Sequence, residues 1–403
     1  MKSNKIADGI FQLGANINNG DLFEGLWPIP DGVSLNSYIV KGEKTALIDL
    51  VDDWDNAPNN LLNQLDQIDI ELESIDYIVL NHLEPDHTGW IKGFLEKTKD
   101  VVIVTSPKGE KMLRALFSYQ GEVLVVNDGD ELDLGGQKLT FYHIPFVHWP
   151  ETMVTFHKES GVLFSCDAFG SYGALGNEVF DDQISEEKHK FYDNESLRYY
   201  ANIVAGYSLP VIKAIDKLEG LDVKVIAPSH GIIWRENPSI IIERYRKFAK
   251  YMSGEAEKEI TMIVGSMYGK TKAVVSSIVK GIRSEGIPVH IFNVPEDDIS
   301  FILSSAWKSK GLVIGMPTYE GKMFPPTSSV LEMFSLKHVW NKEVFRFGSY
   351  SWSGGAQRDF ENKTEKLKWN CIEPLEWLGE AKEEELNSAY LQGKKLAIKV
   401  KES

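Results

Sequence analysis

Asn-His-Leu-Glu-Pro-Asp-His-Thr-Gly, at residues 81–89, is the stretch on which the interpretation of this sequence depends. It follows the apolar run Ile-Asp-Tyr-Ile-Val-Leu at 75–80, which predicts a buried strand. Four potential metal ligands fall within six residues, in the spacing H-x-E-x-D-H: His82, Glu84, Asp86 and His87. A strand end that turns sharply aims alternate side chains at one point, and Pro85 disfavours a continuing helix there. The motif predicts a metal site rather than a charged loop, because such dense ligand clusters are rare by chance.

Three further candidate ligands each follow an apolar run in the first 250 residues. These runs cover 138–147, 162–166 and 223–228, and the residues that follow them are His148, Asp167 and His230. Strands that end along one edge would bring all seven groups together. Four imidazoles and three carboxylates, with no thiolate, suit iron or manganese at least as well as zinc. Seven ligands exceed the need of one tetrahedral ion, whereas two ions that share one carboxylate would use them all.

The composition is that of a folded globular protein, with 43% apolar and 25% charged residues in a chain of 403. The formal charge of −16 disfavours nucleic-acid binding, because the chain repels phosphates. Two cysteines, Cys166 and Cys371, are too few for a disulfide framework, a four-thiolate zinc site or an iron–sulfur cluster. The sequence has neither a signal peptide nor an apolar run of about 18 residues. We therefore expect a cytoplasmic protein that does not bind membranes.

The order of predicted strands and helices changes near residue 254. Before it, short strands follow one another with few helices, among them a long helix over 186–218, and this favours two packed sheets with helices outside. The polar stretch at 253–258 is the best linker candidate. After it, strands and helices alternate, which predicts a parallel, doubly wound sheet. We expect one domain over 1–254 and a second over 255–403.

A second group of motifs lies in the later domain. Val-Gly-Ser-Met-Tyr-Gly-Lys-Thr at 264–271 follows a predicted strand and opens a helix, where hydroxyls and backbone N–H groups can cradle a phosphate. Loops at 315–320 and 348–355 also follow strands, so the three loops meet at the switch point of the sheet. Tyr319 and Trp352 are candidates to stack on a planar ring or, alternatively, to pack on the surface. The candidate binding residues are Ser266, Met267, Tyr268, Gly269, Lys270, Thr271, Pro317, Thr318, Tyr319, Glu320, Ser351, Trp352, Ser353, Gly354 and Gly355.

The metal motifs resemble those of the flavodiiron (A-type flavoprotein) family, whose N-terminal half is a metallo-β-lactamase-like αββα sandwich. The matching segments are H-x-E-x-D-H, His-Trp-Pro at 148–150, Ser-Cys-Asp-Ala-Phe-Gly at 165–170 and Ser-His-Gly at 229–231. Hydrolases of this superfamily usually carry His at the position of Glu84, and a carboxylate there is similar to the iron-binding pattern. The later loops resemble the FMN-binding loops of flavodoxin, a doubly wound parallel sheet, although related loops often have Asn at the position of Lys270. The resemblance to flavodiiron proteins covers nearly the whole chain.

The resemblance implies a non-heme diiron site and an FMN cofactor. One iron would be held by His82, Glu84 and His148, the other by Asp86, His87 and His230, with Asp167 as the bridge. Some family members carry a His in the stretch that matches 19–27, where this chain has none. In its place the candidates to shape a gas pocket are Phe23, Glu24 and Trp27. Tyr199 and Tyr200 are candidates for a proton donor near the site. It is equally consistent with the sequence that both only pack in the core.

The implied activity is the reduction of dioxygen to water, of nitric oxide to nitrous oxide, or of both, which scavenges these gases. Rubredoxin or a related reductase would supply the electrons, because two cysteines leave no rubredoxin-like site in this chain. A head-to-tail homodimer, or a tetramer built from it, would place the FMN of one subunit beside the irons of the other. One alternative is a dinuclear zinc hydrolase fused to a flavodoxin-like module, which Glu84 and the flavin loops disfavour. The other is a flavin electron carrier or gas sensor, which leaves the complete ligand set unexplained.

Overall fold

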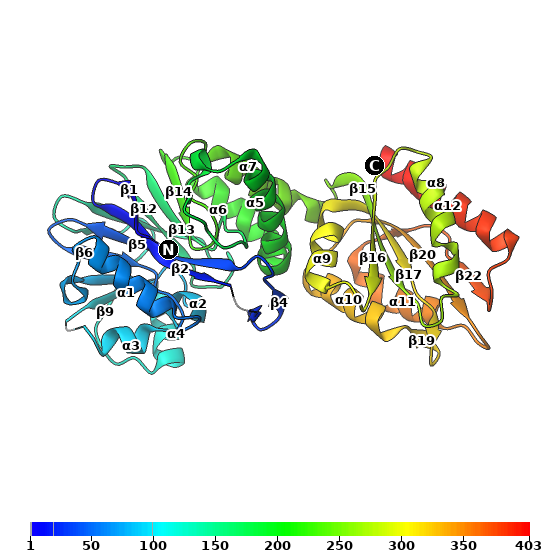
Figure 1. Cartoon of the computed structure of the whole chain (residues 1–403), viewed down its shortest axis with the longest axis horizontal. Helices are drawn as coiled ribbons and strands as arrows, with labels where there is room; N and C mark the ends of the chain where they lie inside the picture. The colour runs from blue at the N-terminus through cyan, green and yellow to red at the C-terminus, as the bar shows by residue number, and fades with distance from the viewer. Residues whose placement is uncertain (1, 19, 99) are drawn as a thin grey trace. The chain divides into compact units, whose positions relative to one another are not determined.

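The computed structural model describes residues 2–18, 20–98 and 100–403 (Figure 1). The chain divides into two compact units, Met1–Arg246 and Lys247–Ser403. The predicted linker at 253–258 lies near the start of the second unit. None of the helices in the described residues has the length and apolar character that a membrane span requires.

Two large sheets form the core of the first unit, and a two-stranded ribbon pairs β3 (Leu22–Phe23) with β4 (Trp27–Pro28). The larger has the order β1 (Asn4–Ala7), β2 (Ile10–Ile17), β5 (Val33–Lys41), β6 (Thr45–Ile48), β7 (Tyr77–Val79), β8 (Val102–Thr105) and β9 (Val123–Val125). The smaller has the order β10 (Glu131–Asp133), β11 (Lys138–His143), β12 (Met153–His157), β13 (Val162–Cys166) and β14 (Val225–Pro228). Every residue of β13 is buried, which its continuous apolar run predicts for a strand covered on both faces.

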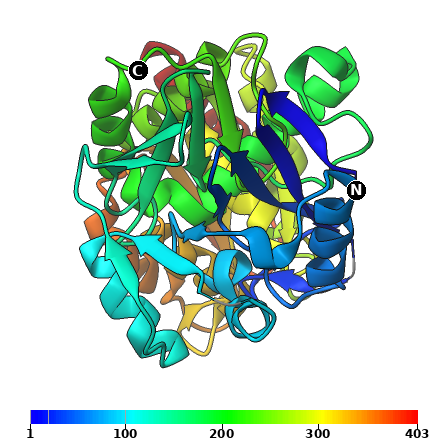
Figure 2. The same ribbon diagram turned by 90° about the vertical axis from the view of Figure 1, so that its left-hand side faces the viewer.

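Helices cover the outer faces of both sheets (Figures 1 and 2). Those on the side of the larger sheet are α1 (Ala57–Gln67), α3 (Ile91–Leu95) and α4 (Pro107–Phe117), and those on the other side are α5 (Glu186–Tyr199), α6 (Ser208–Leu218) and α7 (Ser239–Lys250). Serine residues cap two of these helices: Ser106 Oγ accepts the Gly109 N–H at 3.1 Å, and Ser185 Oγ accepts the Lys188 N–H at 3.3 Å. The result is the predicted sandwich of two sheets between helices.

Two local predictions need correction. The chain over 186–218 is not one helix, because a π-helical turn at Tyr200–Val204 and a 3₁₀ turn at Ala205–Tyr207 separate α5 from α6. Pro85 does not prevent a helix either. It begins the one-turn helix α2 (Pro85–Thr88), since the first helical position tolerates the missing N–H of proline.

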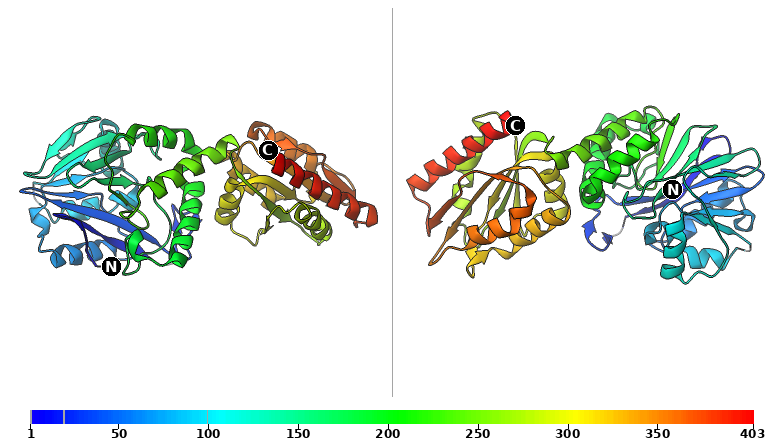
Figure 3. Two further views of the ribbon diagram at one scale, coloured as in Figure 1. Left: turned by 90° about the horizontal axis from the view of Figure 1, so that it is seen from above. Right: turned by 180° about the vertical axis from the view of Figure 1, so that it is seen from behind.

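A parallel sheet with helices on both faces forms the second unit (Figure 3). Its strands follow the order β16 (Val289–Val294), β15 (Glu257–Gly265), β17 (Ser309–Gly315), β20 (Glu343–Tyr350) and β21 (Asn370–Cys371), and β22 (Leu375–Leu378) also pairs with β20. The helices are α8 (Val275–Arg283), α9 (Ile299–Lys308), α10 (Pro325–Leu336), α11 (Ala356–Thr364) and α12 (Glu383–Glu402). This order places β15 and β17 side by side at the centre of the sheet, so that the loops after them share one edge.

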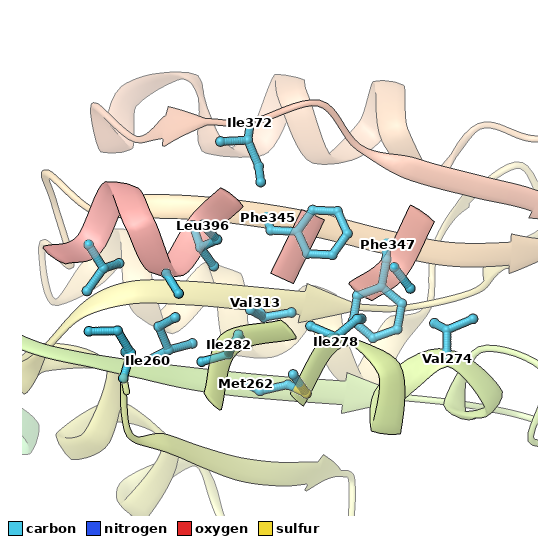
Figure 4. Close-up of a cluster of buried hydrophobic side chains, with 14 of the residues drawn as sticks. Ile260, Met262, Val274, Ile278, Ile282, Val313, Phe345, Phe347, Ile372 and Leu396 are labelled. Atoms are coloured by element: carbon cyan, nitrogen blue, oxygen red, sulfur yellow. The ribbon is translucent and has the colours of Figure 1, made fainter. Parts of the chain in front are cut away.

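The core of the second unit lies between this sheet and the pair α8 and α12 (Figure 4). Ile260, Met262 and Val313 project from the strands towards Ile278 and Leu396 on the helices. Two glycines let the helices approach closely. A Cβ at Gly281 would lie 2.1 Å from the Tyr390 carbonyl oxygen, and one at Gly393 would lie 2.4 Å from the Ile278 carbonyl oxygen.

Lys342 is buried at the start of β20. Its amino group donates to the carbonyl oxygens of Trp307 at 2.8 Å and Ser309 at 2.7 Å. Burial, with a smaller contribution from nearby Lys310, lowers the pKa of Lys342 to about 7.

Candidate functional site

The predicted metal ligands meet because the strands that carry them end at one edge. His82 and Glu84 follow β7, and α2 carries the next two ligands of the motif. Asp167 follows β13, and His230 follows β14, which runs parallel to β13 with Cys166 opposite Pro228. His148 comes from the loop between β11 and β12. The structure thus brings together all seven residues that the sequence singled out.

The first group of ligands contains His82, Glu84 and His148. Glu84 Oε2 lies 2.9 Å from His148 Nε2 and 3.2 Å from His82 Nε2. Asp167 Oδ2 lies 3.3 Å from both of these imidazole nitrogens. Two imidazoles and two carboxylates therefore converge within the reach of one ion.

The second group contains Asp86, His87 and His230. Asp86 lies 3.1 Å from His230 Nε2 through Oδ2 and 3.4 Å from His87 Nε2 through Oδ1. Asp167 Oδ1 lies 2.9 Å from His87 Nε2 and 3.3 Å from His230 Nε2. The two oxygens of Asp167 therefore face different groups, as a bridging carboxylate requires.

Burial and charge fit these residues for cations. Among the described residues, Asp86 Oδ1 and Oδ2, Asp167 Oδ2 and His230 Nε2 are buried without a hydrogen bond. Buried polar atoms that lack a partner carry a large desolvation cost, and a metal ion at their centre would remove it. The donor set, imidazole with several carboxylates, is the chemistry of iron and manganese as well as zinc.

The pKa values of the ligands reflect the same crowding. Burial alone disfavours the charged form of each histidine, but the surrounding carboxylates outweigh it. They raise the pKa of His82 and His230 to about 10 and the pKa of His87 and His148 to about 9. The histidines in turn hold the pKa of Glu84 and Asp167 below the ordinary carboxyl range, against the effect of burial. The cluster thus attracts positive charge strongly.

Two buried carboxylates that sequence analysis missed support the ligand loop. Glu151 Oε1 lies 2.7 Å from His82 Nδ1. Asp49 accepts the backbone N–H of Asn81 at 2.8 Å and its side-chain amide at 3.1 Å, which fixes the residue before the motif. Their positions in the sequence could have indicated that they lie near the site, because Glu151 lies three residues after His148 and Asp49 directly follows β6.

A cavity of about 970 Å³ opens beside the second ligand group. Its lining residues are Gly20, Asp21, Leu22, Phe23, Glu24, Gly25, Asp52, Asp53, Trp54, Glu84, Pro85 and Asp86. Phe23 and Glu24 lie in this wall as predicted, whereas Trp27 is fully buried behind it and donates its indole N–H to Glu24 at 2.9 Å. The Phe23 ring packs edge-on against His230 with 5.4 Å between ring centres. Residue 19 of the predicted stretch lies outside the described residues.

The two candidate tyrosines differ in their surroundings. Tyr199 is fully buried, and its ring centre is 5.6 Å from that of His230. Burial, reinforced by Asp167, raises the pKa of Tyr199 well above its ordinary value. Tyr200 instead pairs its hydroxyl with Ser208 Oγ at 2.8 Å and packs its ring against Tyr245. Tyr199 thus contacts one of the seven ligands, His230.

A second pocket, of about 40 Å³, lies at the predicted edge of the parallel sheet. Eight predicted residues line it: Ser266, Met267, Tyr268, Lys270, Thr271, Pro317, Thr318 and Ser351. Ser349 and Tyr350, which sequence analysis missed, complete the wall. Thr271 Oγ1 lies 3.0 Å from Ser349 Oγ and so links the first and third loops. Clustered hydroxyls before a 3₁₀ turn at Lys272–Val274, which leads into α8, fit a phosphate group.

The remaining predicted residues belong to the same three loops but are not among those that line the pocket: Gly269, Tyr319, Glu320, Trp352, Ser353, Gly354 and Gly355. Trp352 is 84% exposed and Tyr319 is 43% exposed, so both rings are accessible to a planar ligand. Lys270 lies 3.6 Å from Glu380 at the surface. The donor set therefore fits a phosphate with an attached aromatic ring.

Comparison with known proteins confirms the predicted fold of both halves. The family described as "ODP family beta lactamase" matches residues 33–231, and flavodoxin matches residues 262–393. These ranges contain all seven metal-site candidates and all fifteen flavin-site candidates, respectively.

Known proteins match nearly the whole chain, and three of them show this. A nitric oxide reductase from Moorella thermoacetica is 30% identical over 403 residues, which cover 98% of each chain. The structure of a rubredoxin oxygen:oxidoreductase from Desulfovibrio gigas gives a TM-score of 0.94 at 28% identity, and the match covers 100% of this chain and 99% of that one. A flavo di-iron protein from Thermotoga maritima gives a TM-score of 0.88 at 29% identity, over 98% of each chain.

Proposed function

The chain belongs to the flavodiiron proteins, and on that premise we propose that it reduces nitric oxide to nitrous oxide, dioxygen to water, or both. It is an oxidoreductase whose cofactors are two iron ions and FMN. When bound, two ferrous ions and reduced FMN supply four electrons, enough to convert dioxygen to two waters or to join nitric oxide molecules in pairs. The observation that carries the proposal is the way Asp167 directs one oxygen to each group of ligands.

The assignment of ligands follows these two groups. His82, Glu84 and His148 would hold one iron, and Asp86, His87 and His230 would hold the other. Asp167, which faces both groups, would be shared between the two ions. Glu84 supports iron over zinc, because an additional carboxylate stabilises the oxidised state of a redox metal.

The cavity beside the irons supports a small, uncharged substrate. Asp21, Glu24, Asp52 and Asp53 line its mouth, so the local potential repels anions and does not oppose a neutral gas. The Phe23 ring packs edge-on against that of His230 and gives the cavity an apolar wall beside this ligand. We propose that these residues admit the gas and disfavour anions.

A proton must reach the product, and Tyr199 is the better supported of the two tyrosine donors. Its ring lies beside that of His230, and burial, reinforced by Asp167, raises the pKa of the Tyr199 hydroxyl, which therefore holds its proton more tightly than an exposed tyrosine does. Tyr200 is the weaker candidate, because its hydroxyl already pairs with Ser208. We assign Tyr199 to hold a proton at its hydroxyl oxygen.

Electrons reach the FMN from a separate protein, for which rubredoxin is our candidate. The name of the Desulfovibrio relative supports this donor, and so do the two cysteines of the chain, which are fewer than a rubredoxin-like iron site needs. The homodimer or tetramer expected from the resemblance stays a proposal, which a fully active monomer in sedimentation would contradict. The domain boundary at residues 254 and 255 and the cytoplasmic location also stay predictions.

The experiment begins with the purified protein. Iron, zinc and FMN are measured per chain, and consumption of nitric oxide and of dioxygen is then followed with an excess of reductant. We expect iron and FMN near stoichiometric levels and reduction of at least one gas. Zinc without iron, or full iron and FMN without any gas consumption, would contradict the proposal.

A further inference from the structure

Glu151 and His82 form a fully buried pair behind the metal ligands. His82 Nδ1 lies 2.7 Å from Glu151 Oε1, and neither side chain has any exposed surface. The opposite ring nitrogen, Nε2, lies 3.2 Å from Glu84 Oε2 and so faces the metal position. A carboxylate on the far side of a ligand imidazole is the arrangement that orients such a ligand and makes it more basic.

Glu151 is held firmly in this place. The backbone N–H of Leu83 donates to the same Oε1 at 3.0 Å, and Ser106 Oγ donates to the Glu151 carbonyl oxygen at 2.8 Å. The ring of Trp149 packs edge-on against His82, with 4.9 Å between ring centres. The imidazole therefore has one orientation, with Nδ1 as the donor to Glu151 and Nε2 free for the metal.

One of the two histidines at the other metal position, His230, has a different kind of partner. His230 is also fully buried, and its Nε2 faces Asp86 and Asp167. Its Nδ1, however, lies 2.7 Å from the backbone carbonyl oxygen of Ser34. The two imidazoles thus share burial and hydrogen-bond length, but one donates to an anion and the other to a neutral group.

We propose that Glu151 is a positioning residue that makes the two metal positions electronically unequal. A hydrogen bond to a carboxylate is stronger than one to a carbonyl, so His82 becomes the more electron-rich ligand. A metal ion at His82, Glu84 and His148 would consequently be bound more tightly, and its ferric state would be favoured more than that of the neighbouring ion. The inference rests on the ligand assignment proposed above.

Metal titration of the apoprotein tests this inference without any measurement of gas turnover. Glu151→Gln keeps the shape of the side chain and removes its charge. Asp181→Asn is the matched control, because Asp181 is also buried and accepts backbone N–H groups, those of residues 235–237, without contacting any metal ligand. Ferrous ion is titrated against a competing chelator, and Mössbauer spectra of the partly oxidised, iron-loaded proteins show which iron is ferric.

We expect Glu151→Gln to lower the affinity for one of the two metal ions by about 10- to 100-fold and to leave the affinity for the other unchanged. In the wild type we expect the ferric component at one of two resolved iron sites, and in Glu151→Gln we expect it at both. Asp181→Asn should alter neither the two metal affinities nor the distribution of ferric iron. Wild-type affinities and an unchanged ferric distribution in Glu151→Gln would overturn the inference, and so would equal weakening of both ions.

Two further variants keep the test decisive. If Glu151→Gln does not fold, Glu151→Asp, which keeps the charge but shortens the side chain, should still weaken one ion selectively, and unchanged affinities would overturn the inference. The ligand assignment is checked with His82→Ala, which should lose the metal ion assigned to His82, Glu84 and His148. Two ions at full affinity in that variant would refute the ligand assignment itself, which is a failure of the proposed function rather than of the role of Glu151 alone.

Discussion

Replacement of Asp167 by Asn should weaken the binding of both metal ions at once. Its two carboxylate oxygens divide between the ligand groups, with Oδ2 at 3.3 Å from His82 Nε2 and Oδ1 at 2.9 Å from His87 Nε2. An amide has one ligand oxygen and no charge, so one ion loses a ligand and the other loses an anionic neighbour. No other carboxylate in the described cluster faces both groups.

The size of the effect follows from this geometry. Loss of a group that merely orients a ligand lowers metal affinity by about 10- to 100-fold. A direct, shared ligand should therefore contribute at least the upper value, about 100-fold or roughly 2.8 kcal/mol, at the ion that loses it. The ion that keeps the amide oxygen should weaken by about tenfold or more, because it loses the negative charge.

Chelator competition with ferrous ion measures both affinities in one titration. Glu84→Gln and Asp86→Asn are matched controls, because each of these carboxylates contacts histidines of one group only. Each control should weaken a single ion. The reasoning is refuted if Asp167→Asn weakens only one ion, or if either control weakens both equally.

Three further predictions concern the flavin pocket, the proton donor and the fold. Thr271→Val should lower FMN affinity by about 10-fold or more, the value of one hydrogen bond to a charged group, as measured by flavin fluorescence with the apoprotein; unchanged affinity would remove this loop from the phosphate site. Tyr199→Phe should lower kcat by about 100-fold while Tyr200→Phe leaves it within about twofold, and equal rates in steady-state assays would exclude Tyr199 as the proton donor. Between pH 7 and 10, Lys342 is protonated in the unfolded chain and neutral in the folded chain. The free energy of unfolding of the wild type, relative to that of Lys342→Met, should therefore rise by about 1.4 kcal/mol per pH unit, as measured by urea denaturation. A pH-independent difference would contradict the low pKa of Lys342.

The ligands were predictable because each has a local signal. The H-x-E-x-D-H spacing follows a strand, and Asp167 and His230 follow apolar runs that read as strands. Parallel pairing of β13 with β14 then places those two residues at the same edge. The residues themselves did not indicate that Asp167 is shared between the two ligand groups. That expectation came from the family resemblance.

Other features depend on packing between distant segments. Glu151 reads in the sequence as an ordinary charged residue after a proline, and its burial arises from contacts with Leu83 and Ser106. The π-helical turn at Tyr200–Val204 interrupts a segment whose residues suit a continuous helix. Ser349 enters the flavin pocket through its contact with Thr271, which lies 78 residues earlier. A single sequence offers no periodicity that marks such contacts.

The central claim is that the paired ligand groups hold irons that reduce a diatomic gas. Its most direct test is a single reaction of the fully reduced protein, with iron and FMN at measured occupancy, with excess nitric oxide and in parallel with dioxygen, in the absence of further reductant. We expect rapid oxidation of the protein, with one nitrous oxide formed for each two electrons lost or one dioxygen consumed for each four. A reduced protein with full iron and FMN that stays reduced in the presence of both gases would contradict it.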